Sequence, residues 1–125
     1  RVKEKGRLKC YEYWPMDSEE YETFTVTLDK QNDDDAVIIR NFTVKNNKTK
    51  EIRKITHFQY IEWPDFGLPS STIKFREMLH GVDESHKVDA PLLVHCSAGI
   101  GRTGTFCALH SIFHYLKQKG YNEDC

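Results

Sequence analysis

Apolar and polar side chains alternate along the first half of the chain, as β-strands that bury one face require. This alternation predicts one strand at Thr23–Leu28, a second at Ala36–Lys45 and a third at Thr49–Ile61. The acidic run Asn32–Asp35 predicts a solvated loop between the first two strands. A hairpin turn at Asn46–Asn47 is predicted to join the last two, because Asn tolerates positive φ.

The pattern changes to a helical period in the middle of the chain. The segment Trp63–Pro69 holds two prolines and a glycine, which predicts a loop. Ser70 and Ser71 follow and are suited to cap a helix. Apolar residues then recur at spacings of 3, 4 and 7, the spacings of one helix face. These core-facing positions are Phe75, Met78, Leu79 and Val82.

The last third predicts a short strand, a tight loop and a long helix. Pro91–Val94 is wholly apolar, which favours a strand at the centre of a sheet. Thr103–Lys119 carries one apolar face and predicts a helix that Gly120 ends. Cys107 follows the apolar Phe106 in that helix, so we expect it to be buried. Strands followed by helices predict an α+β or mixed α/β fold.

Length and composition indicate one folded domain. The chain has 125 residues, of which 38% are hydrophobic and 12% aromatic. Lys and Arg number 18 and Asp and Glu 19, so the net charge of −1 gives no bulk attraction to nucleic acid or to an anionic membrane. No apolar run approaches the ~18–20 residues needed to cross a bilayer, so no membrane insertion of this segment is expected.

Cysteine and histidine spacing gives neither a disulfide framework nor a metal site. Cys10, Cys96, Cys107 and Cys125 form no C-x-x-C pair, which favours reduced thiols in an intracellular protein. The isolated histidines form no H-E-x-x-H pattern, so no metal ligands are predicted. They are His57, His80, His86, His110 and His114.

The segment from His95 to Gly104 combines a cysteine, an arginine and three glycines. It lies between the predicted apolar strand and the start of a helix, and its three glycines allow tight curling. A curled loop points successive N–H groups inward, and the helix N-terminus adds partial positive charge. Arg102 has a bidentate guanidinium that suits an oxyanion. The segment therefore predicts an anion-binding loop.

The same environment is expected to lower the pKa of the Cys96 thiol from ~8.5 into the range of ~3.5–7.5. Thr103 can stabilise the sulfur as a leaving group through its hydroxyl. His95 can hydrogen-bond the loop and help to keep the thiol ionised. The alternative is a glycine-rich turn around a structural cysteine, which would not explain why a Cys, an Arg and a helix N-terminus occur together.

This segment resembles the phosphate-binding loop of the phosphotyrosine-specific protein tyrosine phosphatases. Trp63–Pro69 resembles the mobile acid loop of that family, Glu4–Pro15 its glutamate-bearing loop, and His57–Tyr60 the strand that leads into the acid loop. The resemblance implies the cysteine-phosphatase fold, an α/β (α+β) fold with a highly twisted mixed sheet flanked by helices. It also implies that residues 1–125 are the central part of a single catalytic domain, incomplete at both ends.

The resemblance implies a role for each matching residue. Asp65 would be the general acid and then the base, although an Asp after Pro is by itself more often a turn residue. Trp63 would be the hinge of the acid loop. Glu4 would orient Arg102, and Lys9 would add to the charged surroundings. Cys96 would be the nucleophile, assisted by Thr103. The substrate-binding residues would be Asp65, Cys96, Ser97, Ala98, Gly99, Ile100, Gly101 and Arg102.

The function that the resemblance implies is hydrolysis of phosphotyrosine in proteins through a cysteinyl-phosphate intermediate. This reaction requires no cofactor, and the partners would be phosphotyrosine-containing proteins. The protein would be cytoplasmic, either as a soluble enzyme or as the cytoplasmic portion of a receptor. Two alternatives stay open. A catalytically inactive phosphatase domain could act as a phosphotyrosine-binding module, and a sulfur-transfer or arsenate-reducing enzyme could use a similar loop. The discriminating feature is whether Asp65 acts as an acid.

Overall fold

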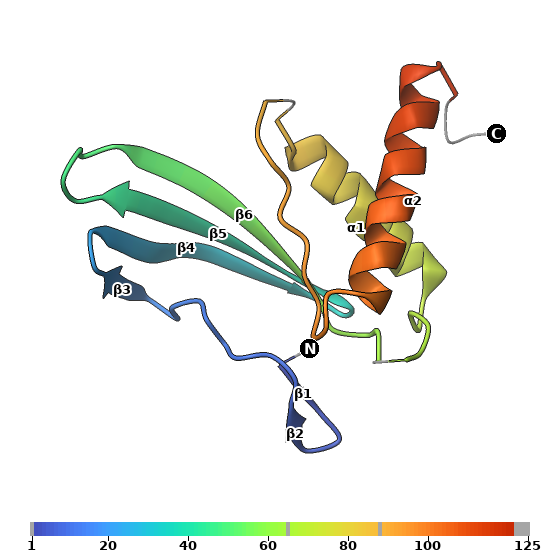
Figure 1. The fold of residues 1–125 in the computed structure, drawn as a ribbon, viewed down its shortest axis with the longest axis horizontal. Coiled ribbons are helices and arrows are strands. Elements are labelled where there is room, and N and C mark those ends of the chain that lie inside the picture. Colours follow the sequence, from blue (N-terminus) through green and yellow to red (C-terminus); the bar gives the residue numbers. More distant parts are fainter. Residues whose placement is uncertain (1, 65, 88, 122–125) are drawn as a thin grey trace. The chain divides into compact units, whose positions relative to one another are not determined.

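The structure is a computed structural model that describes residues 2–64, 66–87 and 89–121. The chain divides into two compact units, Arg1–Glu62 and Trp63–Cys125. All strands of the described residues belong to the first unit, and both helices belong to the second (Figure 1). The predicted α+β class is confirmed. Each unit is described by itself below.

The first unit contains a small hairpin and a four-stranded sheet. Lys5 and Gly6 have φ of 48° and 75°, so both turn residues of the hairpin adopt the left-handed conformation of a type I′ turn. All pairings within the described strands are antiparallel, and the order in the sheet is β3-β4-β5-β6. The strands are β1 (Lys3–Glu4), β2 (Arg7–Leu8), β3 (Ser18–Tyr21), β4 (Phe24–Asp34), β5 (Val37–Asn46) and β6 (Ile52–Tyr60).

The acidic run predicted as a loop is mostly strand. Asp33 and Asp34 pair with Ile38 and Val37 across the β4–β5 hairpin, which leaves only two residues between the strands. The prediction was wrong because local polarity was considered without the partner strand. Val37 and Ile38 are β-branched residues with a strong preference for strands, and their pairing extends β4 through Asp33 and Asp34.

The turn between β5 and β6 comprises residues 47–51 and not Asn46–Asn47, and it does not use positive φ at Asn. The positive φ of 65° falls on Lys50 and not on Asn46. The Asn46 side chain instead accepts hydrogen bonds from the backbone N–H groups of Lys48 at 3.0 Å and Thr49 at 3.2 Å. Asn therefore serves this turn as a side-chain acceptor.

A buried arginine joins three strands of the first unit. Arg40 on β5 is 4% exposed, and it donates to the side chains of Gln31 on β4 and Gln59 on β6, each at 2.9 Å. Its guanidinium lies 4.5 Å from the ring centre of Trp14, a cation–π contact. Burial lowers the pKa of Arg40, an effect that the charge of Glu12 opposes. The charge is thus held by neutral acceptors and an aromatic face.

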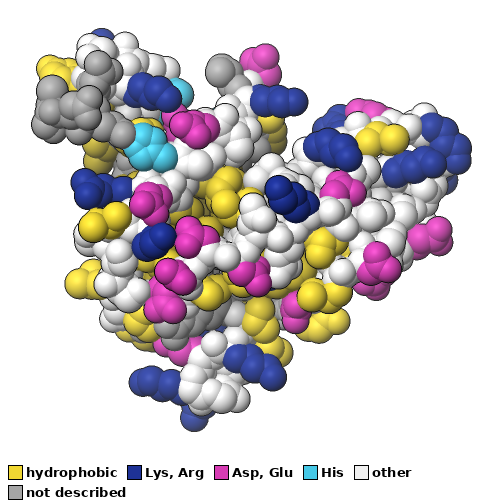
Figure 2. All heavy atoms as spheres, turned by 180° about the vertical axis from the view of Figure 1, so that it is seen from behind, with side chains coloured by type: hydrophobic (Ala, Val, Ile, Leu, Met, Phe, Trp, Pro, Cys, Tyr) yellow, Lys and Arg dark blue, Asp and Glu magenta, His cyan; other side chains and the backbone are white. Residues whose placement is uncertain are grey.

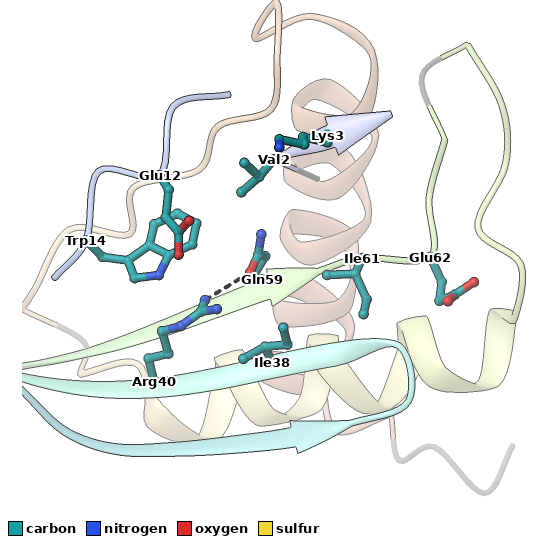
Figure 3. A pocket seen from close by; sticks show the side chains of 9 residues that line it. All are labelled: Val2, Lys3, Glu12, Trp14, Ile38, Arg40, Gln59, Ile61 and Glu62. Atoms are coloured by element: carbon teal, nitrogen blue, oxygen red, sulfur yellow. Dashed lines mark hydrogen bonds between the residues drawn. The ribbon is translucent and has the colours of Figure 1, made fainter. Parts of the chain in front are cut away.

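Arg40 also lies on the wall of a hollow of about 470 Å³ in the first unit (Figure 3). Lys3 and Arg40 supply two positive charges to its lining, and Glu12 and Glu62 supply two negative ones, so the formal charges cancel. None of the predicted site residues lines it. The lining residues are Val2, Lys3, Glu12, Trp14, Ile38, Arg40, Gln59, Ile61 and Glu62.

The second unit contains α1 (Thr72–Ser85) and α2 (Gly101–Gln118). Ser71 caps α1, since its hydroxyl accepts the N–H of Lys74 at 3.2 Å, as predicted. Gly120, with φ of 83°, follows the end of α2 and makes paired backbone bonds typical of a glycine C-cap. The four predicted core positions of α1 are all buried. They are Phe75, Met78, Leu79 and Val82.

Three predictions for the second unit were wrong. Pro91–Val94 forms no strand, because a strand needs a hydrogen-bonded neighbour and the described residues of this unit offer none. Leu93 is accordingly 90% exposed. Cys107 is exposed rather than buried. The third concerns the start of α2, which lies two residues earlier than predicted. Phe106 is the buried residue of the apolar face of this helix.

The surface carries charges of both signs. Figure 2 shows acidic and basic side chains interspersed on one face, with hydrophobic side chains between them, in keeping with the near-zero net charge. Within the described residues, neither helix is long and apolar enough to cross a membrane.

The Arg40 network predicts a specific loss of stability. Arg40→Met keeps a long stem but removes the donors to Gln31 and Gln59, so we expect the free energy of unfolding to fall by about 1–3 kcal/mol. Urea unfolding followed by tryptophan fluorescence measures it. Arg53→Met is the matched control, because the Arg53–Glu51 ion pair is exposed and such pairs contribute at most about 1 kcal/mol. Equal losses in the two variants would contradict a structural role for Arg40.

Candidate active site

The predicted anion-binding loop occupies residues 95–100 and leads directly into α2. Gly99 has a φ of +75°, a conformation that side chains rarely adopt, so glycine is required there. Gly101 and Gly104 lie in α2, and a Cβ at either would meet no atom within 4 Å. One of the three glycines is therefore needed for backbone conformation, and the other two leave open space around the loop.

Hydrogen-bond donors converge on the sulfur of Cys96. The N–H of Gly99 donates to Sγ at 3.1 Å. The backbone N–H groups of Ile100 and Thr103 also interact with the sulfur. The Thr103 hydroxyl is buried and makes no hydrogen bond of regular geometry among the described residues, and its interaction with Cys96 lowers the pKa of the thiol. The loop and the first turn of α2 thus surround one potential negative charge.

These contacts set the ionisation of the thiol. Burial raises the pKa of Cys96, but the hydrogen bonds from the Thr103 hydroxyl and from the backbone outweigh it and lower the pKa from 9.0 to about 7. Roughly half of the thiol is ionised near neutral pH as a result. The thiolate is the nucleophilic form of cysteine.

The start of α2 is open to an anion. Its N-cap, Ile100, has no capping side chain, and the first helical bond runs from the N–H of Gly104 to the Ile100 carbonyl at 2.9 Å. The N–H groups of the first turn are therefore not used by a cap. Together with the helix dipole they favour negative charge at this end.

Arg102 connects the anion-binding loop to Trp63, the first residue of the predicted acid loop. Its Nη1 donates to the Trp63 carbonyl at 3.2 Å. Trp63 is itself buried, and its Nε1–H donates to the Gly67 carbonyl at 3.0 Å. The Trp63 indole thus joins the two ends of the 63–67 segment beside Arg102.

Gly67 is a site residue that the sequence analysis did not single out. A Cβ at this position would lie 2.7 Å from Cγ of Pro64, closer than real contacts allow. The Gly67 N–H also donates to the Pro64 carbonyl at 3.2 Å. The signal in the sequence was a glycine three residues after a proline, which marks a tight turn but does not reveal the close approach.

The remaining predicted site residues fall in three places. His95 is the first residue of the anion-binding loop, and its Nδ1 donates to the Cys96 carbonyl at 3.2 Å. Glu4 and Lys9 belong to the first unit, with Glu4 directly opposite Arg7 in the β1–β2 hairpin. Asp65, the predicted acid, lies outside the described residues. The roles predicted for these four residues stay predictions.

Comparison with known proteins assigns the chain to a family. The sequence model of the family Protein-tyrosine phosphatase matches residues 1–123. The chain belongs to the protein-tyrosine phosphatase family.

Several curated relatives carry the same class of name. Tyrosine-protein phosphatase 2 of Dictyostelium discoideum is 46% identical over 126 residues, which cover 95% of this chain and 33% of the relative. Receptor-type tyrosine-protein phosphatase eta of Homo sapiens is 38% identical over 93% of this chain and 9% of its own length. Tyrosine-protein phosphatase non-receptor type 4 of Mus musculus is 39% identical over 86% and 12%. The chain therefore spans a third or less of these relatives.

The hydrogen bonds to the sulfur predict a pH dependence of alkylation. The rate of iodoacetamide reaction at Cys96 should rise with pH around a midpoint of about 7. Thr103→Val removes a donor to the thiolate, so the midpoint should move upward by about one unit. Mass spectrometry of the Cys96 peptide separates this reaction from that of the exposed Cys107.

Thr105→Val is the matched control for this measurement. The Thr105 hydroxyl donates to the Gly101 carbonyl at 2.9 Å within α2 and is not among the donors to the sulfur. Its loss should leave the Cys96 midpoint unchanged. A midpoint near the ordinary cysteine value in the wild type, or the same shift in both variants, would show that Thr103 does not stabilise the thiolate.

Proposed function

We propose that the protein hydrolyses phosphotyrosine in proteins through a covalent cysteinyl-phosphate intermediate. The observation that carries the proposal is the set of donors around Cys96, which lowers the pKa of the thiol to about 7 at the N-terminus of α2. Membership of the tyrosine-phosphatase family supports the choice of substrate. One group of atoms then supplies both a nucleophile and a phosphate-binding site.

The first step transfers the phosphoryl group to sulfur. The Cys96 thiolate attacks phosphorus, an S–P bond forms, and the P–O bond to the tyrosyl oxygen breaks. Arg102 and the N–H groups of residues 97–102 bind the equatorial phosphate oxygens. Asp65 donates its proton to the departing phenolate, a contribution of the order of 10²–10⁴ in rate.

The second step releases phosphate. Asp65, now ionised, accepts a proton from water as the water oxygen attacks phosphorus. The S–P bond breaks, its electrons return to Cys96, and inorganic phosphate leaves. The Thr103 hydroxyl donates to the thiolate that forms, which makes the sulfur a better leaving group. These steps use charges and protons of the chain itself and require no cofactor.

Other predicted residues position this machinery. Trp63, which is buried and accepts from Arg102 through its carbonyl, acts as the hinge of the acid loop. His95 holds the Cys96 carbonyl. Glu4 orients the guanidinium of Arg102, and Lys9 adds positive charge when the acid loop closes.

For the whole protein, we propose that residues 1–125 are the central part of a single catalytic domain. Its partners are phosphotyrosine-containing proteins and not nucleic acids. We place this domain in the cytoplasm, as a soluble enzyme or as part of a receptor, since relatives of both kinds match. The second candidate, a phosphotyrosine-binding module without turnover, is weaker because Cys96, Arg102 and Asp65 are all present.

Phosphate release from a phosphotyrosine peptide tests the proposal. The complete protein should release phosphate from this peptide and not from a matched phosphoserine peptide. Cys96→Ser should abolish turnover, because a hydroxyl at this site is not ionised near neutral pH. Asp65→Asn should lower kcat by about 10²–10⁴ while the peptide still binds. Cys107→Ser, which removes an exposed thiol on α2, is the matched control and should keep full activity.

The outcomes separate the candidate functions. Binding of the phosphotyrosine peptide without any turnover by the wild type would favour the binding module. Turnover that survives Cys96→Ser would exclude a cysteinyl-phosphate intermediate. Equal rates on both peptides would contradict the proposed selectivity for phosphotyrosine.

A further inference from the structure

We propose that Asp83, His110 and His114 form a proton-sensitive clamp between α1 and α2. Asp83 lies near the end of α1, and both histidines lie on α2, one helical turn apart. The clamp holds the two helices together while the buried His110 ring is neutral and weakens when this ring takes up a proton. The proposal concerns the packing of the second unit and does not depend on the proposed function.

Asp83 is the centre of the cluster. Its side chain is 7% exposed, and its Oδ2 accepts a hydrogen bond from Lys117 Nζ at 2.7 Å. Its Oδ1 lies 3.4 Å from Nδ1 of His114. The Lys117 hydrogen bond holds the pKa of Asp83 below its ordinary value, against the effect of burial. Asp83 is therefore a carboxylate that links α1 to α2 at neutral pH.

His114 links Asp83 to a neighbour on its own helix. Its Nδ1 faces the Asp83 carboxylate, which only accepts, so this nitrogen donates. Its Nε2 lies 3.0 Å from the side-chain amide of Gln118. His114 is therefore fixed in position beside the carboxylate of α1.

His110 is held beside the carboxylate without a hydrogen bond to it. Its side chain is 14% exposed, and Nε2 lies 3.9 Å from Oδ1 of Asp83, beyond hydrogen-bond distance. Nε2 is buried and has no hydrogen-bond partner among the described residues. The ring stacks on Phe106 with centres 5.7 Å apart and planes at 11°, so packing fixes its position.

Burial and charge together give the direction of the effect. The groups that face His110 are Asp83 from α1, His86 just after α1, and His114 from α2. The Asp83 carboxylate favours a proton on His110, but it is already paired with Lys117 at 2.7 Å. A proton on His110 would place a positive charge on a buried ring whose Nε2 has no hydrogen-bond partner among the described residues, and such a charge is costly.

The ionisation of His110 agrees with this direction. Burial lowers the pKa of His110, and the neighbouring His114 and His86 lower it further, while Asp83 opposes them. A lowered pKa in the folded state means that folding favours the neutral ring. This contribution to stability is complete above the unfolded pKa of about 6.5 and is lost as the pH falls below it.

A hollow gives solvent access to these rings. It has a volume of about 240 Å³ and is lined by His86, His110, Ser111, His114, Tyr115 and Gln118. The described part of the chain contains no group of three His, Cys, Asp or Glu side chains placed to hold a metal ion.

The clamp stands at one end of a continuous series of ring contacts. His110 stacks on Phe106, Phe106 lies 6.3 Å from Phe75, and Phe75 lies 5.2 Å from Trp63. Trp63 accepts from Arg102 through its carbonyl. We expect a shift of α2 against α1 to change the environment of the Trp63 indole, because close-packed rings cannot move independently.

Two measurements on the complete protein test the clamp. Histidine ring signals in NMR should show that His110 titrates at lower pH in the folded than in the urea-unfolded protein, and lower still in Asp83→Asn. Urea unfolding between pH 7.5 and 5.5 should show the unfolding constant of the wild type rising as the pH falls, by up to about tenfold per pH unit for each proton taken up.

Variants then assign the effect to His110. His110→Phe keeps a ring on Phe106 but takes up no proton, so the rise in the unfolding constant should become smaller. The Trp63 indole signal should follow the His110 titration in the wild type and not in His110→Phe. His80→Phe is the matched control, because His80 is also an imidazole of α1 that contacts a ring of α2, Phe113, at 5.1 Å. It should leave the acid response unchanged.

Three results would overturn the proposal. One is an equal titration midpoint of His110 in the folded and unfolded protein. Another is an acid response that is the same in His110→Phe as in the wild type. The third is a Trp63 signal that does not follow His110, which would show that protonation of His110 does not shift α2 against α1. The NMR titration of the wild type decides the first point even if a variant fails to fold.

Discussion

The stabilisation of negative charge on Cys96 Sγ is the interaction on which the proposed active site depends. Burial acts against that charge, and the donors of the loop and of the first turn of α2 outweigh it, which brings the pKa of the thiol to about 7. The same donors face any phosphate that the sulfur attacks. Gly99 combines a positive φ with an N–H group that donates to the sulfur at 3.1 Å. The proposed catalytic and binding roles therefore rest on the conformation of this loop.

The features of the second unit that could be predicted are those determined by neighbouring residues in the sequence. The Ser71 cap and the buried face of α1 depend on side chains within one or two turns, and both were predicted correctly. The strand expected at Pro91–Val94 depends on a hydrogen-bonded neighbour elsewhere, which apolar composition cannot supply. The close approach of Gly67 to Pro64 likewise arises from a loop conformation that no periodicity encodes.

Buried charges were the least predictable part of both units. Arg40 appears in the sequence as one polar residue in a strand, yet it is 4% exposed and bonded to two glutamines on neighbouring strands. Asp83 appears as a surface residue of a helix, yet its side chain is 7% exposed between α1 and α2. In each case partners distant in the sequence satisfy the charge. The two differ in their main partners, since Arg40 donates to two neutral glutamines and Asp83 accepts from the charged Lys117.

Chemical trapping of the intermediate tests the central claim most directly. The complete protein is mixed with a phosphotyrosine peptide, quenched within milliseconds and digested, and the peptides are analysed by mass spectrometry. The proposed mechanism predicts a phosphate group on the peptide that contains Cys96, at a level that rises in Asp65→Asn if hydrolysis of the intermediate is slowed more than its formation. Rapid turnover with phosphate on another residue, or with no trapped phosphate in either form, would contradict it.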